Sequence, residues 1–225
     1  DKDGNWMMAY TGTMSILTNK DLVKNPPKSF KDILSGDYKV TIDDVVGGTQ
    51  SQSAVLAAAK AFGGDETNIQ PGLDFFAKLA KQGRLIVNKN DLASVEKGEV
   101  QVTLIWDFNA LGFKEKIDPA RFDVCIPEEG SVRTGYSTII NRYAKHPYAA
   151  MLTREYIFSD EGQINLAKGF AKPVREDVKL PDNVKAKLLP TEQYKNVSSI
   201  DDNAWSKTVK TLPQLWQEQV LANIK

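Results

Sequence analysis

Residues 126–175 read IPEEGSVRTGYSTIINRYAKHPYAAMLTREYIFSDEGQINLAKGFAKPVR, and the patterns in this stretch decide the fold class. A short strand is predicted at 136–141, and it is followed by helices at 146–158 and 160–169. The run ends in a P-V-R segment. A strand followed directly by two helices is typical of a layered α/β protein.

The same alternation runs through the preceding part of the chain. The patterns predict strands at 13–18, 39–43, 84–88 and 100–107, and helices at 29–34, 53–62, 73–80 and 90–98. Ser29, with Asp32 three residues on, marks a capped helix start. In 100–107 apolar residues alternate along one face and end at Trp106. Strands alternating with helices predict α/β layers around a largely parallel sheet.

The C-terminal part is patterned differently. Residues 172–199 are rich in proline and polar residues, with one short helix predicted at 184–188. A long helix closes the chain, and its apolar stripe of Trp205, Val209, Leu212, Trp216 and Val220 is interrupted or restarted at Pro213.

Composition narrows the classes of function. The formal net charge is zero, so nothing electrostatic favours a nucleic acid or an anionic membrane as partner. The single cysteine, Cys125, excludes an internal disulfide and lies in an apolar run, which predicts a buried thiol. We expect neither a metal nor a cofactor.

The stretch WMMAYTGTMSILTNKDLV followed by PPKSFKDIL, at 6–34, resembles the first interlobe crossing of the family 1 extracellular solute-binding proteins. The stretch at 126–175 looks like the return crossing and the helix pair that follows it. The resemblance covers nearly the whole chain. It implies the type II periplasmic-binding-protein clamshell, with two α/β lobes and a small solute held in the cleft between them.

The resemblance further implies a lobe plan and a cellular role. Residues 1–12 would be an interlobe crossing, 13–126 a complete α/β lobe, and 127–225 the return crossing with the C-terminal part of the other lobe. The front of that other lobe has no counterpart here, so we expect a fragment that self-associates through its incomplete lobe. The implied partner is an ABC permease, and the implied location is the periplasm or outer envelope, with any signal or lipid anchor removed.

The strongest candidate for solute binding is GGTQSQSA at 47–54. It joins a strand to a helix, and free N–H groups at a helix N-terminus attract an anion. Thr49, Gln50 and Ser51 are therefore predicted to contact the solute. The alternative is an ordinary capped helix start.

Trp106 and Asp107 form a second candidate, because they end a strand of the predicted sheet. An aromatic face beside a carboxylate suits a cationic amine. The alternative places Trp106 in the core and makes Asp107 a cap of the next turn. The two candidates favour opposite charges on the solute, and a zwitterion satisfies both.

The crossing segments add the remaining site predictions. Through the resemblance they supply contacts from Tyr10, Thr11, Ser131 and Tyr136, and a hinge at Gly12, Pro127 and Gly130. The alternative is that the glycines are ordinary turn residues. Arg175 is predicted to clamp a carboxylate or phosphate, with a surface salt bridge as the alternative.

Two other classes of protein fit the same fold. A carboxylate-based α/β enzyme is one, although no nucleophile or metal motif occurs and the only histidine, His146, precedes a helix start and is predicted to face solvent. An effector-binding domain of a regulator is the other, and it needs an attached DNA-binding segment. We predict a solute binder without catalytic activity, for a polyamine-, zwitterion- or phosphonate-like solute.

Overall fold

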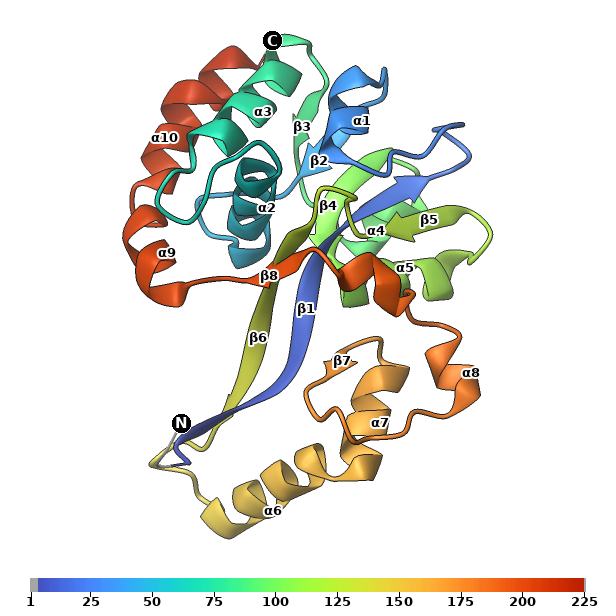
Figure 1. Ribbon diagram of the computed structural model, residues 1–225, viewed down its shortest axis with the longest axis vertical. Helices are drawn as coiled ribbons and strands as arrows, with labels where there is room; N and C mark the ends of the chain where they lie inside the picture. Colours follow the sequence, from blue (N-terminus) through green and yellow to red (C-terminus); the bar gives the residue numbers. More distant parts are fainter. Residues whose placement is uncertain (1–3, 225) are drawn as a thin grey trace. The chain divides into compact units, whose positions relative to one another are not determined.

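The structure is a computed structural model that describes residues 4–224, and its contacts divide the chain into two compact units. Unit 1 contains the residues up to Gly12 and residues 134–188. Unit 2 contains residues 13–133 and 189–225. Two of the three boundaries fall inside strands, β1 (Trp6–Asn19) and β6 (Ser131–Ile139), which therefore belong to both units (Figure 1).

Unit 2 is built on a mixed sheet. The strand order is β3 (Leu85–Val87), β2 (Val40–Ile42), β4 (Val102–Trp106), β1, β6 and β8 (Val197–Ser199), and β5 (Phe122–Cys125) also pairs with β1. β2 is parallel to β3 and β4, whereas β1 is antiparallel to β4, with Met14 opposite Trp106. The predicted parallel arrangement thus holds for β3, β2 and β4 and for the β6–β8 pair, but not for β1, because alternating patterns do not encode strand direction.

Seven α-helices and two short 3-10 helices are described in unit 2. They are α1 (Phe30–Ser35), α2 (Thr49–Ala61), α3 (Gln70–Lys81), α4 (Leu92–Glu96), α5 (Asp107–Ile117), η1 (Thr191–Tyr194), α9 (Asp202–Thr208), α10 (Leu212–Gln219) and η2 (Leu221–Asn223). The predicted cap at Ser29 is confirmed, since its Oγ accepts a hydrogen bond from the Asp32 N–H at 2.9 Å. The predicted restart at Pro213 is also confirmed, since α9 and α10 are separate helices.

Unit 1 contains fewer regular elements. The amino-terminal half of β1 pairs with β7 (Lys172–Pro173), and three helices are described: α6 (Pro147–Phe158), α7 (Asp160–Lys168) and α8 (Asp182–Lys185). The Gln163 side chain donates to the Ala9 carbonyl and accepts from the Val174 N–H, which holds α7 against β1 and β7.

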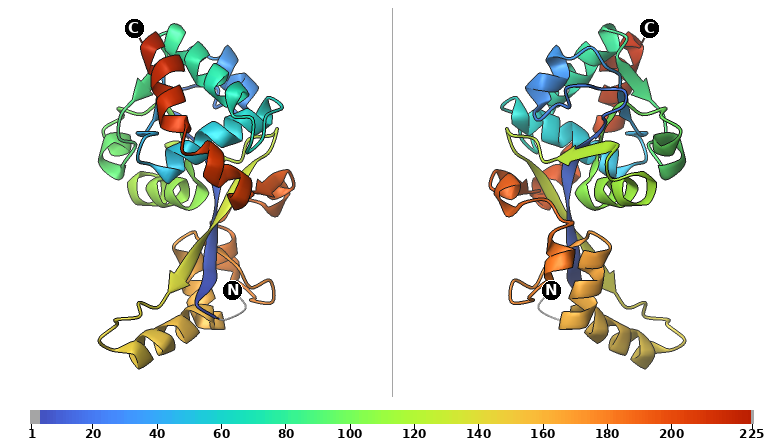
Figure 2. Two further views of the ribbon diagram at one scale, coloured as in Figure 1. Left: turned by 90° about the vertical axis from the view of Figure 1, so that its left-hand side faces the viewer. Right: turned by 90° about the vertical axis from the view of Figure 1, so that its right-hand side faces the viewer.

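The C-terminal residues differ from the prediction. The lobe plan grouped 127–225 together, whereas the structure assigns 189–225 to unit 2. The Trp216 ring packs edge-on against Phe76 at 5.3 Å, and α10 lies along α3 in both views of Figure 2. The apolar stripe of the closing helices is therefore buried on unit 2. The contact boundary after Gly12 lies where the lobe plan places the end of the first crossing, and the lobe plan itself stays a prediction.

The core of unit 2 lies where α2 and α3 cover the sheet. Residues 54–59 of α2 are fully buried, as expected of a helix enclosed on several sides. Gly72 allows α3 to approach α2 closely, because a Cβ atom there would lie 2.3 Å from the Val55 carbonyl oxygen.

Gly72→Ala therefore tests the packing of these two helices. Alanine favours a helix by up to about 1 kcal/mol over glycine, but the clash with backbone costs about 1–3 kcal/mol. We expect a lower free energy of unfolding in urea. Gly47→Ala is the control, because the nearest atom to its Cβ is the Asp44 Oδ2 at 3.8 Å. Equal or greater stability of Gly72→Ala would contradict the packing described.

Candidate functional site

Two helices of unit 2 begin at the same edge of the sheet. β2 leads through a loop to α2, and β4 leads directly to α5, whose first residue is Asp107. Because β2 and β4 are parallel, their carboxyl ends lie together. This edge is where open α/β sheets bind ligands.

Gln50 connects the two helix starts. Its Oε1 accepts a hydrogen bond from the Trp106 N–H at 3.1 Å and another from the Asn109 Nδ2 at 3.1 Å. The structure thus brings the two predicted candidates together. Because Oε1 accepts both hydrogen bonds, they fix the orientation of this half-buried side-chain amide. The other group of the amide, Nε2, is a hydrogen-bond donor.

The first turn of α2 has no side-chain cap. Its N-cap residue is Gly48, so no side chain accepts from the first N–H groups of the helix. The predicted helix started at Ser53, and the structure moves the start to Thr49, because the first turn carries no apolar residue that a periodic pattern can detect. Within this first turn Thr49 is exposed, whereas Ser51 is buried.

Asp107 is buried and hydrogen-bonded within its own unit. Its side chain is 2% exposed. Oδ1 accepts from the Thr13 N–H and the Phe108 N–H, both at 2.9 Å, and Oδ2 accepts from the Tyr194 hydroxyl at 2.8 Å. Burial and the adjacent carboxylate raise the pKa of Tyr194 well above its usual range. Tyr194 is therefore a neutral phenol that donates its proton to Asp107. Through these hydrogen bonds the Asp107 carboxylate links β1, α5 and η1.

Sequence reasoning missed Tyr194, which lies in the proline-rich polar stretch and carries no local signal of its partner. Trp106 is 3% exposed and belongs to the hydrophobic core, as the alternative interpretation expected. Direct solute contacts by Trp106 and Asp107 stay predictions. What the structure assigns to both residues is a role in holding this edge of the sheet together.

The predicted crossing residues at the boundaries of unit 2 are also well packed. The Ser131 hydroxyl, 4% exposed, donates to the Met14 carbonyl at 2.7 Å. Gly130 has φ +109°, and a Cβ atom there would lie 2.4 Å from the Asn196 carbonyl oxygen, so glycine is needed for local geometry. Gly12 and Pro127 are buried. The hinge role of these residues stays a prediction.

In unit 1 the predicted Tyr10 and Tyr136 form a stacked pair. Their ring centroids are 4.7 Å apart and the planes differ by 7°. Thr11 pairs with Lys172 in the ladder between β1 and β7. The stack joins the side chains of β1 and β6 within unit 1.

Arg175 uses its guanidinium within unit 1. It forms ion pairs with Asp160 at 2.8 Å and with Asp177, and it donates to the Phe158 carbonyl at 2.9 Å. The salt-bridge alternative is therefore what the structure contains, and a clamp on a solute stays a prediction.

Other chemistries find little support in the described residues. Within 4–224 no group of three metal-ligating side chains occurs, and no helix is long and apolar enough to cross a membrane. His146 is exposed, as predicted. Cys125 is buried as predicted, and burial raises the pKa of its thiol to about 12, which disfavours the nucleophilic thiolate.

A cavity of about 740 Å³ lies at the other edge of the unit 2 sheet. It is lined by residues 22–27 and by Asp32 and residues 35–38, which precede β2. None of the predicted site residues lines it.

Several solved structures of bacterial proteins closely resemble the fold of this chain. A putative extracellular solute-binding protein from Bordetella parapertussis superposes with a TM-score of 0.76 at 15% identity, covering 97% of this chain and 69% of that chain. An ABC transporter protein from Clostridium perfringens gives 0.71 at 20% identity, covering 97% and 70%. A periplasmic binding protein from Actinobacillus pleuropneumoniae gives 0.73 at 17%, covering 97% and 69%. No curated protein shows a significant sequence match.

These likenesses define the class as the α/β fold of the periplasmic binding proteins. The sequence model of the bacterial extracellular solute-binding proteins matches residues 1–208. The chain belongs to that family. It is a solute-binding component of ABC transport that acts outside the cytoplasm, and the proteins it resembles are binders rather than enzymes.

Asp107→Ala tests the structural role of the carboxylate. The change leaves the buried Thr13 N–H and Tyr194 hydroxyl without their acceptor, which costs about 3–5 kcal/mol of unfolding free energy. Tyr194→Phe removes one of these bonds, and we expect a loss of about 1 kcal/mol. Urea denaturation measures both. Stability within 0.5 kcal/mol of wild type for Asp107→Ala, a shift typical of a surface change, would refute this role.

Proposed function

We propose that the protein captures a small organic solute bearing a carboxylate, phosphonate or phosphate group, and that this group binds at the first turn of α2. The observation that carries the proposal is the uncapped helix start beside an oriented Gln50 amide. Backbone N–H groups, the Thr49 hydroxyl and the Gln50 Nε2 are all donors, and the positive end of the helix dipole adds to their attraction for an anion.

The amine alternative has weaker support. An amine needs a carboxylate as its partner, and Asp107 is buried with three hydrogen bonds inside unit 2. Aromatic rings such as those of the Tyr10–Tyr136 pair in unit 1 are of the kind that contacts a cation. A zwitterion, which carries an amine and an acid, remains within the proposed class.

Proteins of the same fold bind solutes of different chemistry. The Actinobacillus protein holds fructose 6-phosphate and another neighbour is a receptor for GABA, whereas others bind spermidine or putrescine, thiamin or ferric ion. The first two solutes carry an acidic group. The proposal therefore rests on the local donors of α2, since the fold alone accommodates all of these solutes.

Gln50→Glu tests the proposal with little disturbance of the fold. A carboxylate can still accept from the Trp106 N–H and the Asn109 Nδ2, but it replaces the Nε2 donor by a negative oxygen. Titration calorimetry with 2-aminoethylphosphonate, γ-aminobutyrate, fructose 6-phosphate and spermidine identifies a solute. For an acid-bearing solute we expect affinity to fall by about tenfold or more.

Gln217→Glu is the matched control, because it makes the same charge change on an exposed position of α10. It should leave affinity unchanged. Binding of spermidine alone, or an affinity for acids that Gln50→Glu does not lower, would overturn the proposal. Recovery of the solute unaltered after incubation separates binding from turnover.

A further inference from the structure

Asn109 lies in the first turn of α5 and is joined to the proposed solute site through Gln50. Sequence reasoning did not place it among the solute-binding residues, and its side chain is half-buried. Its Nδ2 donates to the Gln50 Oε1 at 3.1 Å. Because α2 and α5 begin at the same edge of the sheet, this hydrogen bond links the side chains of two neighbouring helix starts.

One backbone group determines the orientation of both side-chain amides. A backbone N–H can only donate, so the Trp106 N–H requires the carbonyl oxygen of the Gln50 side chain. That oxygen in turn requires the donor group of Asn109, which is Nδ2. Turning either amide over would place two donors or two acceptors against each other. The other two groups are therefore fixed in kind, with the Gln50 Nε2 as a donor and the Asn109 Oδ1 as an acceptor.

The Asn109 Oδ1 gives the site a polarity that an acidic group alone does not match. Within residues 4–224 the hydrogen bonds of the Asn109 side chain involve Nδ2 alone. A carbonyl oxygen from which a bound solute excludes water is costly to leave without a donor. A site with such an acceptor therefore favours a solute that brings a donor and disfavours the analogue that lacks it.

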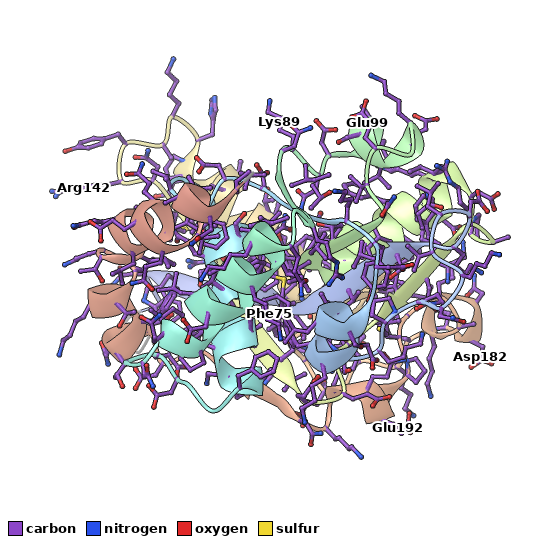
Figure 3. The ribbon with its side chains drawn as sticks, turned by 90° about the horizontal axis from the view of Figure 1, so that it is seen from above. Phe75, Lys89, Glu99, Arg142, Asp182 and Glu192 are labelled. Atoms are coloured by element: carbon purple, nitrogen blue, oxygen red, sulfur yellow. The ribbon has the colours of Figure 1, made fainter. Side chains whose placement is uncertain are left out.

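The charged side chain nearest in the sequence to the third strand end is directed elsewhere. β3 ends at the same edge of the sheet, because it is parallel to β2, and Lys89 follows it. Lys89 is exposed, and Figure 3 shows its side chain pointing away from the ribbon. We assign it no contact with the solute. Selection at this edge then depends on hydrogen-bond polarity, for which Gln50 offers a donor and Asn109 an acceptor.

We propose that Asn109 determines which acids the protein binds, by accepting a hydrogen bond from a hydroxyl or ammonium group close to the acidic group of the solute. This inference rests on the proposed function, since it takes the acidic group to lie at the first turn of α2. The Asn109 amide is directly bonded to the Gln50 amide, so the acceptor and the donor belong to one site. The solute class narrows from acids in general to acids with a nearby hydroxyl or amino group.

Two series of matched solutes test this selectivity by titration calorimetry. One is butyrate, γ-hydroxybutyrate and γ-aminobutyrate, and the other is ethylphosphonate, 2-hydroxyethylphosphonate and 2-aminoethylphosphonate. Within each series the acidic group and the carbon chain are constant, and only the donor changes. In one or both series we expect a donor-bearing member to bind about tenfold more tightly than the plain acid. The tighter of the two donor-bearing members shows whether the donor is a hydroxyl or an ammonium group.

Asn109→Ala tests whether Asn109 is the source of this preference. It removes Oδ1, whereas the Trp106 N–H still orients Gln50. We expect the donor-bearing solute to lose about tenfold in affinity and the plain acid to change by less than about twofold, so that the two bind alike. Fructose 6-phosphate, which carries hydroxyl groups, should also lose about tenfold. A general loss of stability would weaken all of these solutes together and would leave the preference unchanged.

Asn203→Ala is the matched control, because it makes the same change at an exposed position of α9. It should keep the wild-type preference. Two results would overturn the inference and leave the proposed function standing. One is a wild-type protein that binds the plain acids as tightly as their donor-bearing analogues, a comparison that needs no variant to fold. The other is a preference that Asn109→Ala retains. If neither the two series nor fructose 6-phosphate binds, the proposed function itself is wrong.

Discussion

The carboxylate of Asp107 lies where three distant stretches of unit 2 meet, and the rest of this edge depends on it. Thr13 begins the part of β1 that belongs to unit 2, and Tyr194 follows shortly after the chain re-enters that unit at Leu189. Both donate to the same side chain. The chain leaves unit 2 after Arg133, and two residues before this exit the Ser131 hydroxyl donates to the Met14 carbonyl. A buried carboxylate without these donors would be costly, so the network is stable only when complete.

This constraint also positions the proposed solute site. Asp107 is the first residue of α5, where a negative charge is favoured by the helix dipole, and the residue before it gives its N–H to Gln50. The Phe108 N–H in the first turn of α5 thus has Asp107 as its acceptor, and the Trp106 N–H just before the helix has Gln50. The first N–H groups of α2 have no side-chain cap, so of these two helix starts α2 is the one at which we propose that an anion binds.

The elements of the fold were largely predictable, because their signals are local. Ser29 caps α1 through an N–H three residues away, and Pro213 restarts the final helix at its own position. The function of Asp107 was not predictable in this way. Its bonds to Thr13 and Tyr194 join residues 94 and 87 positions apart, and such pairings leave no periodic trace in a single sequence. The contacts of 189–225 with unit 2 are also between residues far apart in the sequence, and they too leave no local signal. The family resemblance in the sequence predicted the class of function. That the first turn of α2 has no side-chain cap could be seen only in the structure.

Amide hydrogen exchange of Thr13 tests the central claim most directly. If the Thr13 N–H is bonded to the buried Asp107 carboxylate, it should exchange only through global unfolding, as slowly as the Ile105 amide in the middle of the sheet. Rapid exchange at Thr13, comparable to that of an exposed loop amide, would contradict the account.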